Sequence, residues 1–264
     1  MNQSDFRPFD GPQPIYVSLP FSIWWPEQHS PSVVVYEDGR IIYTKWFKEK
    51  GTEIGHRYEA VLSKPDLATI YALMEPIQKL KKLKSHYRLT NVPTDGPESR
   101  IYVHSKNGPK RTQIEGFHSR LKRDELAYSK TDAPVIGAFF NMYHYVENLQ
   151  PAQGKPWTPK YIKLLFRKER KPEPEFTLPP RAPAKSRKVV NWPKEWPSFA
   201  SPQVSRQENG YTLFLDAAQW AKLRPVPPIS NDALIRIQGK IYEVLQDEVY
   251  PREPEWYQAF GIVE

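Results

Sequence analysis

Proline crowds one stretch of this chain and limits what that stretch can fold into. Eleven of the 28 prolines fall within residues 151–202. Each proline removes a backbone hydrogen-bond donor and biases the preceding residue towards extended geometry, so this stretch cannot form a regular helix. We interpret it as a connector that contains one short strand at 161–166, where the β-branched and aromatic residues favour extended structure.

The sequence predicts four segments, of which the connector is the third. Residues 1–29 are expected to be irregular, 30–150 to form an α+β domain, 151–202 to form the basic Pro-rich connector, and 203–264 to form a small α+β part. A chain of 264 residues with 39% apolar and 13% aromatic residues can bury a sizeable core. The predicted fold class is α+β: antiparallel β-hairpins packed with two to three helices, plus a smaller, β-rich C-terminal part.

Short turns predict three hairpins. Asp38-Gly39 separates two runs of β-branched and aromatic residues, which is a strong hairpin signal. Asn107-Gly108 and Gln238-Gly239 mark two further turns between extended runs. These turns predict antiparallel strand pairs on both sides of the connector.

Apolar residues at helical spacing predict two long helices. The first begins after Ser63, which is a suitable N-cap because Asp66 follows three residues later. Pro76 lies within its pattern and predicts a kink or an early end. The second helix begins after Asp132, and a short third helix is expected after Asp216.

Positive charge is concentrated in the connector. The chain has a net charge of +8, yet residues 155–194 contain 12 Lys and Arg against 3 Asp and Glu, whereas residues 195–264 contain 6 against 10. A basic segment with interleaved aromatic residues could bind an acidic protein, or follow a phosphate backbone and stack bases; alternatively it is a solvated linker whose aromatic residues dock on the neighbouring domains. The candidate partner-binding residues are Trp157, Lys163, Arg167, Lys168, Arg170, Lys171, Arg181, Lys185, Arg187, Lys188, Trp192 and Trp196.

Catalytic motifs are missing from the sequence. It has no cysteine, no phosphate-binding glycine loop, no zincin motif and no serine-hydrolase elbow. Its six histidines do not recur with one another or with carboxylates at a metal-ligand spacing. We therefore predict no catalytic residue, no metal site and no cofactor.

One turn offers an alternative to this non-catalytic interpretation. Asp95 and Glu98 lie close to predicted strands that hold His104 and His118, so Asp95 could orient one of these imidazoles for acid–base chemistry, as in a hydrolase. Asp, Gly and Pro also occur in turns for backbone reasons alone, which is the simpler explanation.

Tryptophans in irregular segments have two interpretations. Trp192, Trp196 and Trp256 occur within two residues of a proline, where aromatic residues can anchor an interface or pin a loop to its own fold. We favour the second role.

Targeting signals give a further expectation. The first 25 residues have no basic region followed by a continuous apolar run, and the chain has no window near the roughly 18 apolar residues of a membrane helix. We therefore expect a cytoplasmic protein without membrane contact.

The order of these features resembles a known group of domains. Val33–Tyr43 with its Asp-Gly turn, the Ser-capped helix at 62–67, and Asp95-Gly96 followed by Ile101–Val103 are similar to small α+β bacterial domains of unknown function. Some of these resemble immunity proteins, which neutralise toxins delivered between competing bacteria. The resemblance covers residues 30–150 and supplies no catalytic residue.

These observations lead to one leading hypothesis and two alternatives. The missing catalytic motifs, the tryptophans in irregular segments and the basic connector favour a non-catalytic protein that binds an acidic partner, and the resemblance implies that this partner is a toxin which the protein neutralises. The first alternative is a nucleic-acid-binding protein that uses the basic connector. The second is a hydrolase with the Asp95, Glu98 and His104 site. The sequence does not determine the oligomeric state.

Overall fold

The computed structural model describes residues 6–21, 30–49, 52–90, 97–104, 108–118, 121–149, 151, 153–168, 189–207, 210–223 and 234–260. The chain forms two compact units. The first consists of Asp10–Trp157 with Pro251–Glu264, and the second of Met1–Phe9 with Thr158–Tyr250. Each unit contains one β-sheet, so we call them the eight-stranded unit and the six-stranded unit.

The eight-stranded unit is a mixed sheet with helices. Its order is β5-β7-β6-β1-β2-β3-β4-β8, and all neighbours are antiparallel except β5 and β7. The strands are β1 (Pro14–Phe21), β2 (Val33–Tyr36), β3 (Arg40–Glu49), β4 (Thr52–Val61), β5 (His86–Arg88), β6 (Glu98–Val103), β7 (Lys110–Glu115) and β8 (Lys155–Pro156). The helices are α1 (Lys64–Lys79), the short η2 (Arg123–Glu125), α2 (Ala133–Asn148) and α4 (Glu253–Phe260).

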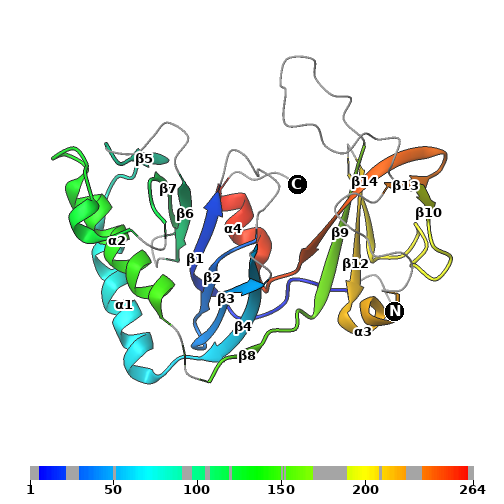
Figure 1. Ribbon diagram of the computed structural model, residues 1–264, viewed down its shortest axis with the longest axis horizontal. Helices are drawn as coiled ribbons and strands as arrows, with labels where there is room; N and C mark the ends of the chain where they lie inside the picture. Colours follow the sequence, from blue (N-terminus) through cyan, green and yellow to red (C-terminus); the bar gives the residue numbers. More distant parts are fainter. Residues whose placement is uncertain are drawn as a thin grey trace, which may run out of the picture. The chain divides into compact units, whose positions relative to one another are not determined.

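Helices cover both faces of this sheet. Figure 1 shows α1 and α2 on one side of the sheet and α4 on the other. Ile70 of α1, Phe139 of α2 and Ile101 of β6 are each 0% exposed and belong to one core. Trp256 of α4 is also 0% exposed, and α4 packs on β6 and β7. Both sheet faces are therefore buried, which stabilises the unit mainly through the hydrophobic effect.

Strand β1 lies at the centre of the sheet, where an irregular segment was expected. It pairs with β2 through residues 14–18 and with β6 through residues 16–21. Pro14 therefore has only β2 beside it and Pro20 only β6. A strand tolerates proline where one neighbour is absent, because the missing N–H has no partner there to lose.

The local predictions in this unit are confirmed. Gly39 has a φ of 84° in the turn between β2 and β3, which a glycine adopts without strain. The Ser63 hydroxyl accepts a hydrogen bond of 3.2 Å from the backbone N–H of Asp66, so the predicted N-cap is formed. Pro76 lies inside α1, and the helix ends three residues later at Lys79.

The six-stranded unit contains the second sheet. Its order is β10-β13-β14-β9-β12-β11, with β10 and β13 parallel and the other neighbours antiparallel. The elements are β9 (Tyr161–Lys168), β10 (Val189–Asn191), β11 (Val204–Gln207), β12 (Gly210–Asp216), α3 (Ala217–Leu223), β13 (Leu234–Ile237) and β14 (Lys240–Glu248). Asp216 caps α3 by accepting a 2.6 Å hydrogen bond from the N–H of Gln219.

The fold class is α+β, as the sequence predicts. The boundaries of the two units differ from those of the four predicted segments. The connector was expected to contain one short strand, but the described part of residues 151–202 contains three, β8, β9 and β10. The expected strand is β9, which lies between β12 and β14 inside the second sheet. Residues 169–188, where five of the connector's prolines lie, are outside the described residues.

Candidate functional site

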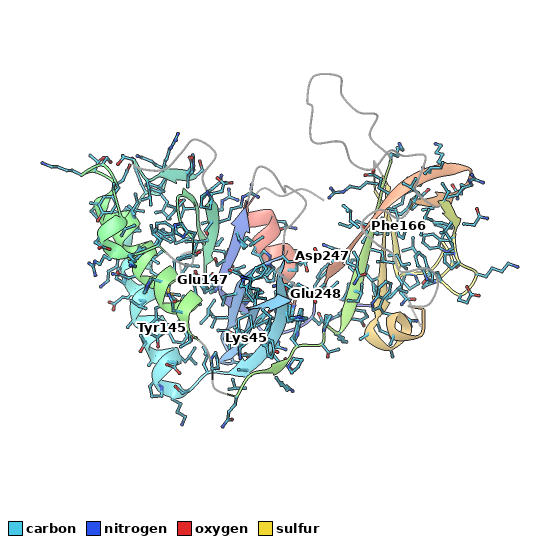
Figure 2. The ribbon with its side chains drawn as sticks, in the orientation of Figure 1. Lys45, Tyr145, Glu147, Phe166, Asp247 and Glu248 are labelled. Atoms are coloured by element: carbon cyan, nitrogen blue, oxygen red, sulfur yellow. The ribbon has the colours of Figure 1, made fainter. Side chains whose placement is uncertain are left out.

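Aromatic residues fill one face of the six-stranded sheet. Phe166, labelled in Figure 2, is 1% exposed and belongs to a cluster with Trp192 and Trp196, at ring separations of 5.2 and 6.0 Å. Ring contacts continue from Trp192 through Phe199 to Tyr211 at 4.4 and 5.3 Å. The segment that follows β10 thus folds over this face and covers its core.

Three cationic side chains lie on the same face of the six-stranded sheet as Phe166. Lys168 lies two residues beyond Phe166 on β9 and directly opposite Tyr242. Arg206 lies opposite Tyr211, which in turn lies opposite Phe166. Because alternate residues of a strand, and residues opposite each other in an antiparallel pair, share a face, the cations and tyrosines are on one side of the sheet.

The turn between β13 and β14 adds the third cation. Gln238 and Gly239 have φ values of 49° and 82°, as in the tight hairpin turns that match the twist of their strands. This turn places Gln238 and Lys240 beside the other cations. Together these side chains line a pocket of about 100 Å³, formed by Lys168, Arg206, Gly210, Tyr211, Ile237, Gln238, Lys240 and Tyr242.

The cationic pocket, as we call it, has no carboxylate in its lining. Within the described residues, Lys168, Arg206 and Lys240 form no ion pair. Burial, and then the neighbouring Tyr211, raises the pKa of Tyr242, while the guanidinium of Arg206 opposes the shift. Tyr242 is therefore a neutral hydroxyl at physiological pH, and the pocket keeps its positive charge.

The size of the pocket limits what it can hold. Ligand sites for small organic molecules start at about 300 Å³, three times this volume. Tyr242 is only 4% exposed, so its ring offers no face on which a base could stack. The pocket therefore suits one oxyanion, either a phosphate or a carboxylate, which could accept hydrogen bonds from the lysine and arginine side chains.

The predicted partner-binding residues lie in several environments. Lys168 lines the cationic pocket, and Arg167 is exposed on the opposite face of the sheet. Lys163 is 1% exposed and lies opposite Asp247 and Phe214 in register, so it is part of the interior. The predicted residues Arg170, Lys171, Arg181, Lys185, Arg187 and Lys188 are outside the described residues.

The predicted tryptophans serve the fold. Trp196 is 6% exposed, and the indole N–H of Trp192 donates a 3.3 Å hydrogen bond to the carbonyl of Pro197. Trp157 is half-buried in the eight-stranded unit, where its backbone N–H donates a 3.0 Å hydrogen bond to the Arg57 carbonyl. Trp192, Trp196 and Trp256 are thus buried or partly buried, in agreement with the role that we favour for them.

Four residues of the cationic pocket were not predicted from the sequence as binding residues. Arg206, Tyr211, Lys240 and Tyr242 belong to residues 195–264, whose summed charge is negative. A sum over 70 residues hides two cations that strand pairing brings beside Lys168. Alternation along the strands is the signal that could have placed them on one face.

The proposed Asp95, Glu98 and His104 site is only partly described. Asp95 is outside the described residues, while Glu98 and His104 lie at the two ends of β6. At about 3.3 Å per residue, the two backbones are roughly 20 Å apart. Glu98 instead lies opposite Glu115 and accepts a hydrogen bond from Gln113. The structure does not bring Glu98 and His104 together.

A partly buried glutamate lies elsewhere in the eight-stranded unit. Glu147, labelled in Figure 2, extends from α2, and its Oε1 accepts a 2.6 Å hydrogen bond from the Ser32 hydroxyl. Burial raises its pKa, and the hydroxyls of Ser32 and Ser18 oppose the shift. The neutral form of this carboxyl group is thus favoured more in the folded state than in the unfolded chain.

Glu147→Gln is expected to raise stability at neutral pH. Because the pKa of Glu147 is raised, the folded chain binds this proton more tightly than the unfolded chain does. The wild type therefore loses stability as pH rises from the ordinary glutamate pKa through the pKa of Glu147 in the folded state. Glutamine carries no charge and can still accept from Ser32. Urea denaturation at about pH 4 and about pH 7.5 should show a gain only at the higher pH. Asp124→Asn, at an exposed position, is the control, and a loss of stability at both pH values would contradict the prediction.

A larger hollow lies between α1 and α2. It measures about 430 Å³ and is mostly apolar, and its walls are formed by Thr69, Leu73, Lys122, Arg123, Phe140, Asn141, His144 and Tyr145. The Phe140 and His144 rings pack at 5.4 Å beside it. This hollow suits an apolar group, whereas the cationic pocket suits an anion.

No protein-family model, curated protein or solved structure gives a significant match to the chain. Within the described ranges, no group of three or more His, Asp or Glu side chains could hold a metal ion. No described helix has both the length and the apolar character needed to cross a membrane. The case for function therefore rests on the geometry of the described residues.

Proposed function

We propose that this chain is a nucleic-acid-binding protein that holds phosphates at the cationic pocket. The observation that carries the proposal is the convergence of Lys168, Arg206 and Lys240 on one sheet face, with no ion-pair partner among the described residues. Like charges repel one another, so such a cluster is stabilised when an anion binds to it.

The sequence beside the pocket supports a polyanion rather than a single small ion. Residues 169–188 begin directly after Lys168 and contain six Lys and Arg against three Glu. A phosphate backbone could therefore continue from the pocket to further cations. The pocket would supply one fixed phosphate position, and the adjoining segment would add sequence-independent affinity.

Replacing Lys168, Arg206 and Lys240 together with glutamate tests this proposal. We expect affinity for a labelled 20-nucleotide random-sequence DNA strand to fall by at least about tenfold at low salt, because the phosphate position is lost and three negative charges face the backbone instead. The slope of log affinity against log salt should shrink by about 0.7, since the pocket holds one phosphate and each phosphate contact on a single strand contributes roughly 0.7. Fluorescence anisotropy across a salt series measures both quantities.

A charge-matched variant controls for the altered net charge. Lys81, Lys82 and Lys130 are exposed on the eight-stranded unit, and their replacement by glutamate changes the net charge by the same amount. This variant should retain most of the affinity and most of the salt slope. Equal losses in both variants would show that only the overall charge matters, and would overturn the assignment to the cationic pocket.

An acidic protein is the second candidate partner. The volume of the pocket also suits one carboxylate, and a protein partner would not need a stacking surface there. This candidate includes the immunity-type role, with a toxin as the partner and a cytoplasmic location. Binding of poly-glutamate, with no binding of DNA or RNA at low salt, would favour it. A toxin gene beside the gene for this chain would favour the immunity-type role.

A further inference from the structure

The hairpin of β3 and β4 extends beyond its sheet. β2 pairs with β3 only as far as Tyr43, and β8 pairs with β4 only at Tyr58 and Glu59. The two strands nevertheless pair with each other as far as Glu49 and Thr52. Residues 45–49 and 52–56 therefore form a two-stranded ribbon that is joined to no third strand in the described part of the chain.

Trp46 lies on one face of this ribbon. It is 65% exposed and lies directly opposite Gly55. A Cβ atom on Gly55 would be 3.1 Å from Cζ3 and 3.3 Å from Cε3 of the indole, and 2.8 Å from Cγ2 of Thr44. The benzene edge of the indole thus rests against the Gly55 backbone. This contact fixes the ring while most of its surface stays in solvent.

Cations flank Trp46 on both sides. Alternation places Lys48 two residues further along β3 on the same face, and Arg57 two residues beyond Gly55 on β4. The side chain of Lys48 is exposed. Arg57 is half-buried and donates a hydrogen bond to the Thr44 hydroxyl, which orients its guanidinium group. Lys48 lies opposite Glu53 in register. Along the ribbon the indole therefore lies between Arg57 on one side and the Lys48 and Glu53 positions on the other.

Aromatic rings and a cationic side chain also lie together on the other face of the ribbon. Phe47 and Ile54 lie opposite each other and are 39% and 37% exposed. The Phe47 ring packs against His56 and Tyr58 at 5.5 and 6.3 Å. Lys45, labelled in Figure 2, places its ammonium group 4.7 Å from the centre of the Tyr58 ring. These contacts stiffen the ribbon that carries Trp46.

We propose that Trp46 stacks an unpaired base of a single-stranded nucleic acid, with Lys48 and Arg57 contacting the phosphates on either side of that base. Each internal nucleotide of a single strand has a flat apolar base between two phosphates, which matches a flat ring between two cations. A paired base is already stacked in its duplex, so the site selects single strands. The inference rests on the proposed function and identifies its substrate class.

Trp46→Ala tests the inference. We expect its affinity for oligo(dT)20 to fall by roughly 5- to 100-fold, the range for loss of one base–aromatic stack. The salt slope should stay unchanged, because no charge is removed. Trp46→Phe should retain most of the affinity, since it keeps an aromatic face. The matched control is Tyr71→Ala, at another exposed aromatic residue of the same unit, which should bind as the wild type does.

The outcomes separate this inference from the proposed function. If Trp46→Ala binds oligo(dT)20 as the wild type does, while the triple glutamate variant of the cationic pocket binds weakly, the stacking site is overturned and the proposed function stands. If the wild type binds neither DNA nor RNA at low salt, both are overturned. Base stacking is also overturned if Trp46→Ala lowers the affinity for duplex DNA as much as the affinity for single-stranded DNA. The same holds if it lowers the affinity for poly-glutamate as much. Circular dichroism and thermal midpoint should match the wild type, since Trp46 is largely exposed.

Discussion

Replacing Gly210 with alanine is expected to lower the free energy of unfolding of the six-stranded unit by about 3 kcal/mol. Gly210 begins β12 and lies opposite Arg167 of β9. An added Cβ atom would lie 1.7 Å from the carbonyl oxygen of Phe166 and 2.9 Å from its carbonyl carbon. Backbone atoms cannot rotate away as a side chain can. Strand β9 is also held on its other side by β14, so β12 must separate from it.

The same substitution at another position provides the control. Gly137 lies within α2, and a Cβ atom there would meet nothing within 4 Å. Gly137→Ala should therefore stabilise the chain by about 0.5–1 kcal/mol, because alanine favours a helix more than glycine does. Urea denaturation with hydrogen exchange assigns each change to its unit. If Gly210→Ala is as stable as the wild type, the close approach of β12 to β9 is wrong.

Replacing Trp256 with alanine is expected to destabilise the eight-stranded unit by about 3–5 kcal/mol. Trp256 is 0% exposed on the face of the sheet that α4 covers. Two polar contacts place the helix: Gln13 donates a 2.6 Å hydrogen bond to Glu255, and Arg252 donates a 3.2 Å one to the Gly11 carbonyl. The lost indole would leave a cavity that these surface contacts cannot close.

Gln258→Ala is the matched control on the same helix. Its side chain is exposed, and its backbone carbonyl, which accepts from Arg111, remains in the variant. We expect a change within about 0.5 kcal/mol. Hydrogen exchange should show faster opening of β6 and β7 in Trp256→Ala only. Similar effects of the two substitutions would mean that α4 contributes little to the sheet.

Features of the fold that depend on neighbours in the sequence could be predicted. The turn at Gly39, the cap at Ser63 and the cap at Asp216 are each formed by residues within a few positions of one another. Such signals need no knowledge of the remaining chain. The predicted hairpins and helices are accordingly present in the structure.

Features that depend on distant pairing could not be predicted. Residues 1–29 were expected to be irregular, and only the pairing of β1 with both β2 and β6 shows why a strand there tolerates Pro14 and Pro20. Likewise, the parallel pair of β10 and β13 joins residues more than 40 positions apart. A single sequence contains no direct record of such contacts.

The candidate site could be predicted only in part, because it too depends on the pairing of distant strands. Lys168 was recognised from local charge density, whereas Arg206 and Lys240 come beside it only through the sheet. Lys163 has the same local sequence signal as Lys168 but lies on the opposite face, where it is buried. Trp46 carries no special sequence signal, because its exposure follows from the length by which the hairpin exceeds its neighbours.

The threading of the chain through two units affects how it folds during synthesis. Residues 10–157 belong to the eight-stranded unit, but α4, which buries one face of that sheet, follows only after residues 158–250. At about 5–20 residues per second, a ribosome needs roughly 5–20 s to make the intervening stretch. During that time the nascent sheet exposes an uncovered apolar face, which is the kind of surface that chaperones bind. The newly made chain should therefore depend on chaperones more than the finished protein does.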